Sequence, residues 1–388
     1  MPLASALRLG PIQDGICDSL TPLELIRLGK TCRSLQGLVN DYIRSAFHPH
    51  RLLSTFFRDV PAFRSIQAQT ASLISGPAAL NFFDRNDSHA DWPLDIIVYF
   101  HHRTLVAHWL IACGYTFVAS MAQSPDLDFT ITEGALARKE VSYEEMAVCD
   151  VLLFHKACAN KSLVINLVIT TRSPAEVILH AHSTCLLNII SYERAYCMYP
   201  RATLHDRRSL LVRASGKEWR GRADELEEMI DRGYDVVDTL FHEDFNLPDE
   251  HRCFTLGWRW IDDPFAWVID FEVGLDIALP PPANSLSSAR THDPVAICGF
   301  ALRCGPDEEP YMEFVVIKGP AVEYSYVLGD QDSADRLITE LYFKSPVWDG
   351  RYWDEESREI CKKLISDCSA QRALRALEGL RRRCVVGP

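Results

Sequence analysis

Apolar side chains near the start of the chain recur at the spacing of an amphipathic helix. Thr21, Pro22 and Glu24 form a capping-box pattern, with a hydroxyl N-cap, a proline at the first helical position and a glutamate at the third. The apolar residues behind it are Leu25, Leu28, Cys32, Leu35, Val39 and Tyr42. Their spacing of three or four positions predicts one amphipathic helix or a broken pair of helices, with a shorter helical turn before it. No strand pattern precedes residue 70, so residues 1–70 are expected to be helical.

Between residues 71 and 200 the pattern changes to short strand-like runs that alternate with helical spacing. The strand-like runs are 94–99, 150–154 and 163–170, and further short apolar runs lie at 73–74 and 185–190. Helical spacing covers residues 78–83, 104–113 and 175–182. A second capping-box pattern, Ser173 to Glu176, precedes the last of these helices. The alternation predicts a domain of the α/β or α+β class.

The remaining residues continue as a mixture of strands and helices. Strand-like runs occur at 267–273, 295–301 and 311–317, and helices are expected near 333–343 and 355–380. An arginine-rich stretch that begins after Pro200 is followed by an acidic stretch, and both are typical of a solvated linker or helix face. We therefore expect an α+β fold in three regions: a helical segment at 1–70, a core with a mixed sheet at 71–200, and an α+β extension at 201–388.

Charge and cysteine content narrow the class of protein. Lys and Arg total 40 against 53 Asp and Glu, and the resulting net charge of −13 would repel nucleic acid from most of the surface. No apolar run reaches the roughly 18 residues that a membrane helix needs, so no membrane association is expected. The 13 cysteines include no C-x-x-C pair, which favours reduced thiols in the cytoplasm or nucleus over a zinc site. Neither a metal ion nor a cofactor is expected.

The N-terminal helical segment resembles an F-box. The resemblance covers residues 10–47, and the residues that carry it are Pro11, Ile16, Leu20, Pro22, Leu25, Leu28, Cys32, Arg33, Ser34 and Leu35. It implies docking onto a Skp-type adaptor of a cullin ubiquitin ligase, through a partly open apolar face at Pro22, Leu23, Leu25 and Ile26. The alternative is a helical cap that packs on the rest of the chain, because the usual opening Leu-Pro-x-Glu is here Gly-Pro-Ile-Gln.

The segment from residue 73 to about 200 is similar to a group of uncharacterised F-box-like proteins of mushroom-forming (basidiomycete) fungi. These proteins carry a nucleotidyltransferase-like core of the polymerase-beta type. The matching stretches are residues 73–85, 94–98, 173–178 and 182–185. The resemblance implies a phosphate-holding turn at Ser75 and Gly76, followed by paired carboxylates on the next strand.

Nucleotidyl transfer needs residues that this chain lacks. Two metal ions require carboxylates at positions i and i+2 of one strand and a third carboxylate on a neighbouring strand. Here the pair is Pro93 and Asp95, and the third position is Asn166. Pro77 stands where the turn would carry a serine, so a hydroxyl and an N–H are both missing. We interpret Ser75, Gly76, Pro77, Asp95 and Asn166 as a degenerate remnant of a nucleotide and metal site.

Two functions follow from these observations. The first is a non-catalytic intracellular interaction protein, a pseudoenzyme whose F-box-like head docks an adaptor while the rest binds an unknown protein client. The alternative is a metal-dependent nucleotidyltransferase or phosphotransferase with a rearranged site. That site would combine Asp95 and a displaced acid with phosphate-binding arginines. The candidate acids are Asp84 and Asp91, and the candidate arginines are Arg201, Arg207 and Arg208.

In the non-catalytic case, we expect Asp95 to line a shallow groove beside the turn at residues 75–77. The carboxylate would be open to solvent or paired with Arg85.

Overall fold

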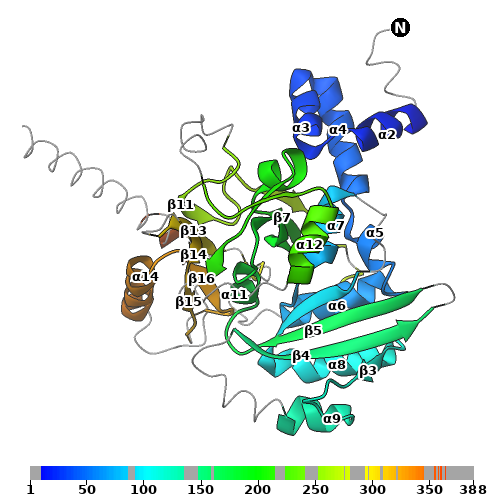
Figure 1. The fold of residues 1–388 in the computed structure, drawn as a ribbon, viewed down its shortest axis with the longest axis vertical. Coiled ribbons are helices and arrows are strands. Elements are labelled where there is room, and N and C mark those ends of the chain that lie inside the picture. Colours follow the sequence, from blue (N-terminus) through cyan, green and yellow to red (C-terminus); the bar gives the residue numbers. More distant parts are fainter. Residues whose placement is uncertain are drawn as a thin grey trace, which may run out of the picture.

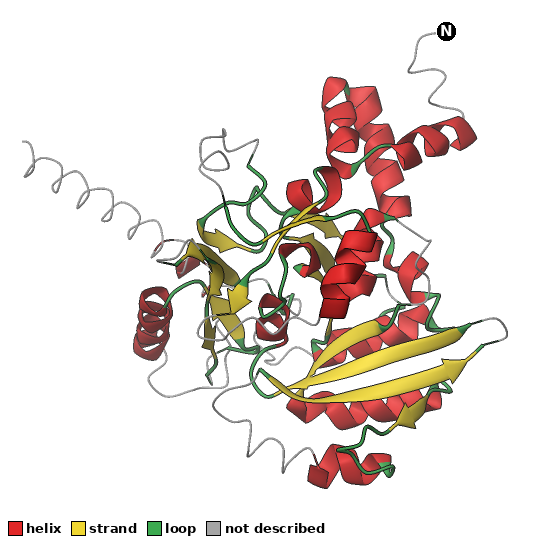
Figure 2. Cartoon of the chain, in the orientation of Figure 1, coloured by secondary structure: helices red, strands yellow, loops and turns green. Residues whose placement is uncertain are grey.

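The computed structural model has both helices and strands around a mixed sheet, so the predicted α+β class is confirmed (Figure 2). It describes residues 10–85, 92–134, 147–158, 161–214, 223–240, 252–274, 276–279, 293–295, 297–305, 309–319 and 322–344, with Asp354, Ser357, Glu359, Ile360 and Lys363. Most of the helix expected at 355–380 lies outside these residues. Within them, none of the helices has the length and apolar character needed to cross a membrane.

Residues 10–70 are mainly helical, as predicted for this part of the chain. The helices are α2 (Gly10–Ser19), α3 (Pro22–Thr31), α4 (Arg33–Ala46), α5 (Pro49–Leu53) and α6 (Val60–Thr70). The capping box at the start of α3 is present, because Thr21 accepts from the Glu24 N–H and the Glu24 carboxylate accepts from the Thr21 N–H at 2.8 Å. The apolar repeat forms a broken pair, α3 and α4. Together α2, α3 and α4 form a helical head at one end of the protein (Figure 1).

One eight-stranded mixed sheet forms the centre of the fold. Its strands are β1 (Leu73–Ser75), β2 (Leu94–Tyr99), β3 (Thr116–Val118), β4 (Val148–Ala157), β5 (Ser162–Thr170), β6 (Asn188–Ile190), β7 (Arg194–Cys197) and β12 (Trp267–Asp270), in the order β12-β7-β6-β1-β2-β5-β4-β3. The β2–β5 pair is parallel and the others are antiparallel. β12 is the last of these strands in the sequence and lies beyond residue 200. The sheet therefore crosses the domain boundary that was expected between residues 200 and 201.

The sheet buries a different set of side chains on each face, because successive residues of a strand point in opposite directions. Ile74, Ile96 and Ile165 belong to a cluster that also includes side chains of the helical head and of α6. The same cluster includes side chains of α7 (Gly76–Asp84) and α8 (Arg103–Ala112). Figure 1 shows α6 and α8 along the long strands β4 and β5.

The other face of the sheet packs against the later part of the chain. Leu73 and Ile97 belong to a second cluster with side chains of α11 (Pro174–Leu179) and of the smaller sheets. The nearby α12 (Ala223–Asp231) contributes Met229 to a small separate cluster. Short helical turns connect the elements: η2 (Phe100–His102), α9 (Leu127–Phe129), η3 (Thr130–Gly134), η4 (Thr184–Leu186) and η5 (Arg201–His205).

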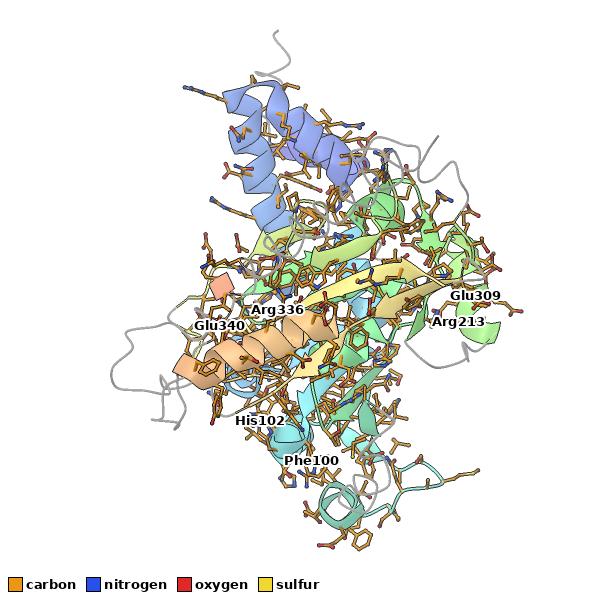
Figure 3. The ribbon with its side chains drawn as sticks, turned by 90° about the vertical axis from the view of Figure 1, so that its left-hand side faces the viewer. Phe100, His102, Arg213, Glu309, Arg336 and Glu340 are labelled. Atoms are coloured by element: carbon orange, nitrogen blue, oxygen red, sulfur yellow. The ribbon has the colours of Figure 1, made fainter. Side chains whose placement is uncertain are left out.

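The smaller sheets come from the predicted extension. They comprise a four-stranded sheet of β9 (Arg213–Ala214), β11 (Gly257–Trp260), β13 (Gly299–Cys304) and β14 (Pro310–Glu313), and the pairs β8 (Arg208–Leu210) with β10 (Asp235–Val237) and β15 (Val315–Ile317) with β16 (Tyr326–Leu328). Arg213 and Glu309 form an ion pair beside β9 and β14 (Figure 3). The helix expected near 333–343 is α14 (Gln331–Lys344), and the strand expected at 311–317 divides into β14 and β15.

The second capping box does not form. Ser173 makes no side-chain cap at the start of α11, because its hydroxyl donates to the Ser325 carbonyl at 2.7 Å. The Glu176 carboxylate instead pairs with Arg172. A partner from a distant part of the chain therefore replaces the local bond, and α11 ends at Leu179 rather than near residue 182.

Arg85 does not pair with Asp95; it joins the helical head to the core. It follows the last residue of α7 and donates to the Cys17 carbonyl at 3.0 Å and to the Tyr42 hydroxyl at 2.6 Å. It also donates to the carbonyl of Leu20, in the link between α2 and α3. Because these acceptors lie on different segments of the head, one guanidinium fixes the head on α7.

We predict that Arg85→Met lowers the free energy of unfolding by about 2 kcal/mol, because the partly buried carbonyls and the Tyr42 hydroxyl lose a charged donor. Urea denaturation measures the loss, and limited proteolysis should show earlier cleavage within residues 10–46. The matched control is Arg44→Met, since the Arg44 side chain is 71% exposed and its ion pair with Asp41 spans 3.8 Å. Equal losses in the two variants would contradict the assigned role of Arg85.

Candidate functional site

Strand register brings three of the predicted site residues into one row. Ser75 on β1 lies opposite Asp95 on β2, which in turn lies beside Asn166 on β5. Asp95 and Asn166 share the alternation of Ile97 and Val168, so they face the side of the sheet on which α11 packs. The Asn166 side-chain amide donates to Asp95 Oδ1 at 2.8 Å. The Ser75 hydroxyl points instead to the start of β6, where it donates to the Asn188 carbonyl at 2.7 Å.

The row opens into a groove of about 390 Å³ between the sheet and two helices. Its floor comes from β2 and β5, and its walls come from α11, α12 and the turn into α7. The lining residues are Ser75, Gly76, Pro77, Trp92, Pro93, Asp95, Ile97, Asn166, Val168, Val177, Ile178, Ala181, His182, Leu186, Glu228 and Met229. The groove therefore contains all five residues of the predicted remnant site, and Asp95 lines it as expected.

Gly76 has a structural role that the sequence did not indicate. Its φ of +69° is rarely adopted by residues with a side chain. A Cβ atom at this position would also collide with the Asp95 carboxylate. Glycine is thus required here because Asp95 occupies the space over the first residue of α7. This close approach leaves the carboxylate, rather than a ligand phosphate, beside the start of the helix.

Burial controls the protonation of Asp95. The groove desolvates the carboxylate and raises its pKa to about 6, although the hydrogen bond from Asn166 acts in the opposite direction. At neutral pH most of the Asp95 side chains are still ionised. The negative charge of Asp95 is therefore incompletely solvated, and the neighbouring strand position holds the neutral amide of Asn166.

The structure does not gather the residues proposed for a rearranged catalytic site. Asp84 forms an ion pair with Arg207 at 2.8 Å. The other two arginines also pair with carboxylates, Arg201 with Asp206 at 3.0 Å and Arg208 with Asp235 at 3.7 Å. None of these residues lines the groove. Asp91 lies outside the described residues.

The donor set does not fit a two-metal centre. Asp95 is the single carboxylate of the expected triplet, and Asn166 directs its amide N–H groups toward it. Two divalent ions need several anionic oxygens between them. Across the described part of the chain, no cluster of three or more His, Cys, Asp or Glu side chains could hold a metal ion.

The residues expected to bind a partner differ in exposure. Pro22 and Leu25 are buried within the protein. Leu25 belongs to the hydrophobic cluster that also contains Ile96 of the central sheet. Leu23 and Ile26 are half-buried. The apolar face of α3 is therefore divided between an internal contact and a smaller accessible part.

Sequence reasoning did not find the wall that α12 and its neighbours provide. Glu228 and Met229 lie in the acidic stretch for which a solvated linker or helix face is expected, and His182 also lines the groove. Trp92 precedes β2 and also lines the groove. No short motif connects these residues to Asp95, since only the tertiary fold brings α12 to this edge.

Comparisons of the chain with protein families, curated proteins and solved structures give no match. The interpretation of the groove therefore depends on its own geometry and charge.

We predict that Gly76→Ala lowers the free energy of unfolding by about 2 kcal/mol or more, because the added Cβ meets Asp95 and the backbone is strained. The control is Gly37→Ala in α4, because a Cβ at position 37 meets no atom within 4 Å. This control substitution should stabilise the helix by about 1 kcal/mol. In an Asp95→Ala background the cost of Gly76→Ala should shrink. An unchanged cost would show that the carboxylate is not the obstacle.

We predict that Asp95→Asn stabilises the protein at pH 7.5 but not at pH 4. Because the folded-state pKa of Asp95 is raised to about 6, its contribution to stability is complete below about pH 4 and is lost as the pH rises through 6. The variant removes this loss, so its advantage should grow to about 1 to 3 kcal/mol at pH 7.5. Urea denaturation at several pH values tests this, with Asp41→Asn on the exposed surface as the control. An advantage independent of pH would contradict the assigned titration.

Proposed function

We propose that this protein is a non-catalytic interaction protein whose helical head docks onto a Skp-type adaptor of a cullin ubiquitin ligase. The observation that carries the non-catalytic part is the Asp95–Asn166 hydrogen bond. It joins a carboxylate to an amide at the two strand positions where nucleotidyl transfer needs two carboxylates. The rest of the chain then serves as a scaffold for a protein client.

An enzyme with a rearranged site is the weaker candidate. Its proposed acid Asp84 is held by Arg207, and its other two proposed phosphate ligands, Arg201 and Arg208, are paired with carboxylates. Recruiting them would require breaking these ion pairs and moving the side chains to the groove. Pro77 also removes one N–H from the turn that would hold phosphate.

The proposal for the head is supported by the part of α3 that the core leaves accessible. Leu23 is half-buried and belongs to none of the hydrophobic clusters formed by the described residues. Ile26, one turn further along, is also half-buried and packs on the edge of the cluster that contains Leu25. The head lies at one end of the protein (Figure 1), and α3 contributes no residue to the groove lining, so a partner at these side chains does not need to contact the groove.

We predict that the purified protein captures a Skp-type adaptor and that Leu23→Asp combined with Ile26→Asp abolishes the capture. Charged side chains at the centre of a small apolar interface remove most of its affinity, whereas half-exposed positions cost less stability than buried ones. Pull-down assays measure capture, and circular dichroism shows whether the variant is folded.

Lys30→Asp provides the matched control, because Lys30 is an exposed residue of the same helix. It should retain capture. If the wild-type protein captures no adaptor, the docking proposal fails. If the double variant is unfolded, α3 is an internal cap and the half-exposed side chains serve only the core.

A further inference from the structure

The Asp95 carboxylate has one oxygen without a hydrogen-bond partner among the described residues. Asn166 donates to Oδ1, and no described donor reaches Oδ2. The groove lining includes no lysine or arginine among the described residues. Oδ2 lies beside Gly76, and Asp95 lines a groove whose described lining offers no basic side chain other than the His182 imidazole.

Arg232, a cation that contacts two residues of the groove lining, is already engaged. Arg232 donates to Glu228 at 2.9 Å, and its guanidinium lies over the ring of Trp92. Glu228 lies at the rim of the groove, and 46% of its side chain is exposed. The ion pair with Arg232 therefore neutralises Glu228, the second acid of the groove, but does not neutralise Asp95. Burying an ionised carboxylate without an opposite charge is costly, and the raised pKa of Asp95 is a consequence of that cost.

The rest of the groove is mainly apolar. Ile97, Val168 and Val177 provide aliphatic surface on the floor and on one wall, and Leu186 and Met229 add to the other walls. A volume of about 390 Å³ lies within the range of sites for small organic molecules. Such a site combines one fixed acceptor with a surface that binds hydrocarbon.

We propose that the groove binds a small organic cation that carries a primary ammonium group on an apolar body. The ammonium would donate to Asp95 Oδ2 and neutralise the carboxylate, and the hydrocarbon would cover the aliphatic walls. An ammonium suits a single carboxylate because it needs only one counter-charge and offers three donors. A divalent metal needs more anionic oxygens, and a phosphate would be repelled by Asp95. This site is independent of the adaptor docking proposed for the head.

The test uses the full chain and hexylammonium chloride as the probe, in isothermal titration calorimetry at pH 7.5. We expect saturable binding of hexylammonium that is at least tenfold weaker in Asp95→Asn and unchanged in Asp41→Asn, which alters an exposed acid of the head. Methylammonium should bind at least tenfold more weakly than hexylammonium, because it lacks the hydrocarbon. Hexanol and hexanoate should bind no more tightly than methylammonium.

Three results would overturn the proposal. Equal binding of hexanol and hexylammonium would show a purely apolar groove. Equal binding to the wild-type protein and to Asp95→Asn, or no binding at all, would show that the carboxylate does not select a cation. A rise in melting temperature with Mg²⁺ and ATP that is lost in Asp95→Asn would show a retained metal and nucleotide site instead.

Discussion

The contact between Asp95 and the first residue of α7 constrains the start of that helix. Only glycine leaves room for the carboxylate at position 76, so α7 begins directly at the end of β1. The helix is nine residues long, or roughly 13 Å, and it ends at Asp84. Arg85 is thereby placed where its guanidinium reaches Cys17 and Tyr42. The hydrogen bonds of Arg85 therefore hold the helical head on the end of α7 opposite the groove contact.

The alternation of side chains along β2 and β5 separates the two regions of interest. Ile96 and Leu167 face the cluster that contains the head, whereas Asp95 and Asn166 face the groove. Because the intervening sheet is apolar on the head side, a polar change in the groove does not need to disturb the packing of α3. The two proposed binding regions can therefore be tested separately.

Local patterns predicted the elements whose partners lie nearby in sequence. The capping box of Thr21 and Glu24 forms because both groups belong to the same helical turn. The alternation within β2 and within β5 also indicated which residues of each strand share a face, whereas the register of Asp95 beside Asn166 is set by the pairing of the two strands. The same local pattern failed at Ser173, where the Ser325 carbonyl competes from a distant part of the chain.

Long-range contacts were beyond the reach of sequence patterns. The pairing of Asp95 with Arg85, one of the two expected environments of the carboxylate, rested on charge alone. The Arg85 guanidinium instead donates to two carbonyls and a hydroxyl of the head, so it has several acceptors there. Glu228 belongs to the acidic stretch that was interpreted as solvated, and half of its side chain is indeed exposed. Its place at the groove depends on how α12 packs, which no residue spacing encodes.

The polarity of the groove follows from the neutral residue at position 166. In a two-metal site each carboxylate is neutralised by the ions that it binds. Here the Asn166 amide satisfies one oxygen of Asp95 by a neutral donor, which leaves the negative charge in place. Hydrogen bonding alone does not offset the loss of solvation, so the pKa of Asp95 remains above its usual value. A groove of this kind does not favour phosphate, because the charge of Asp95 is negative, and it attracts a group that brings a positive charge and an apolar surface together.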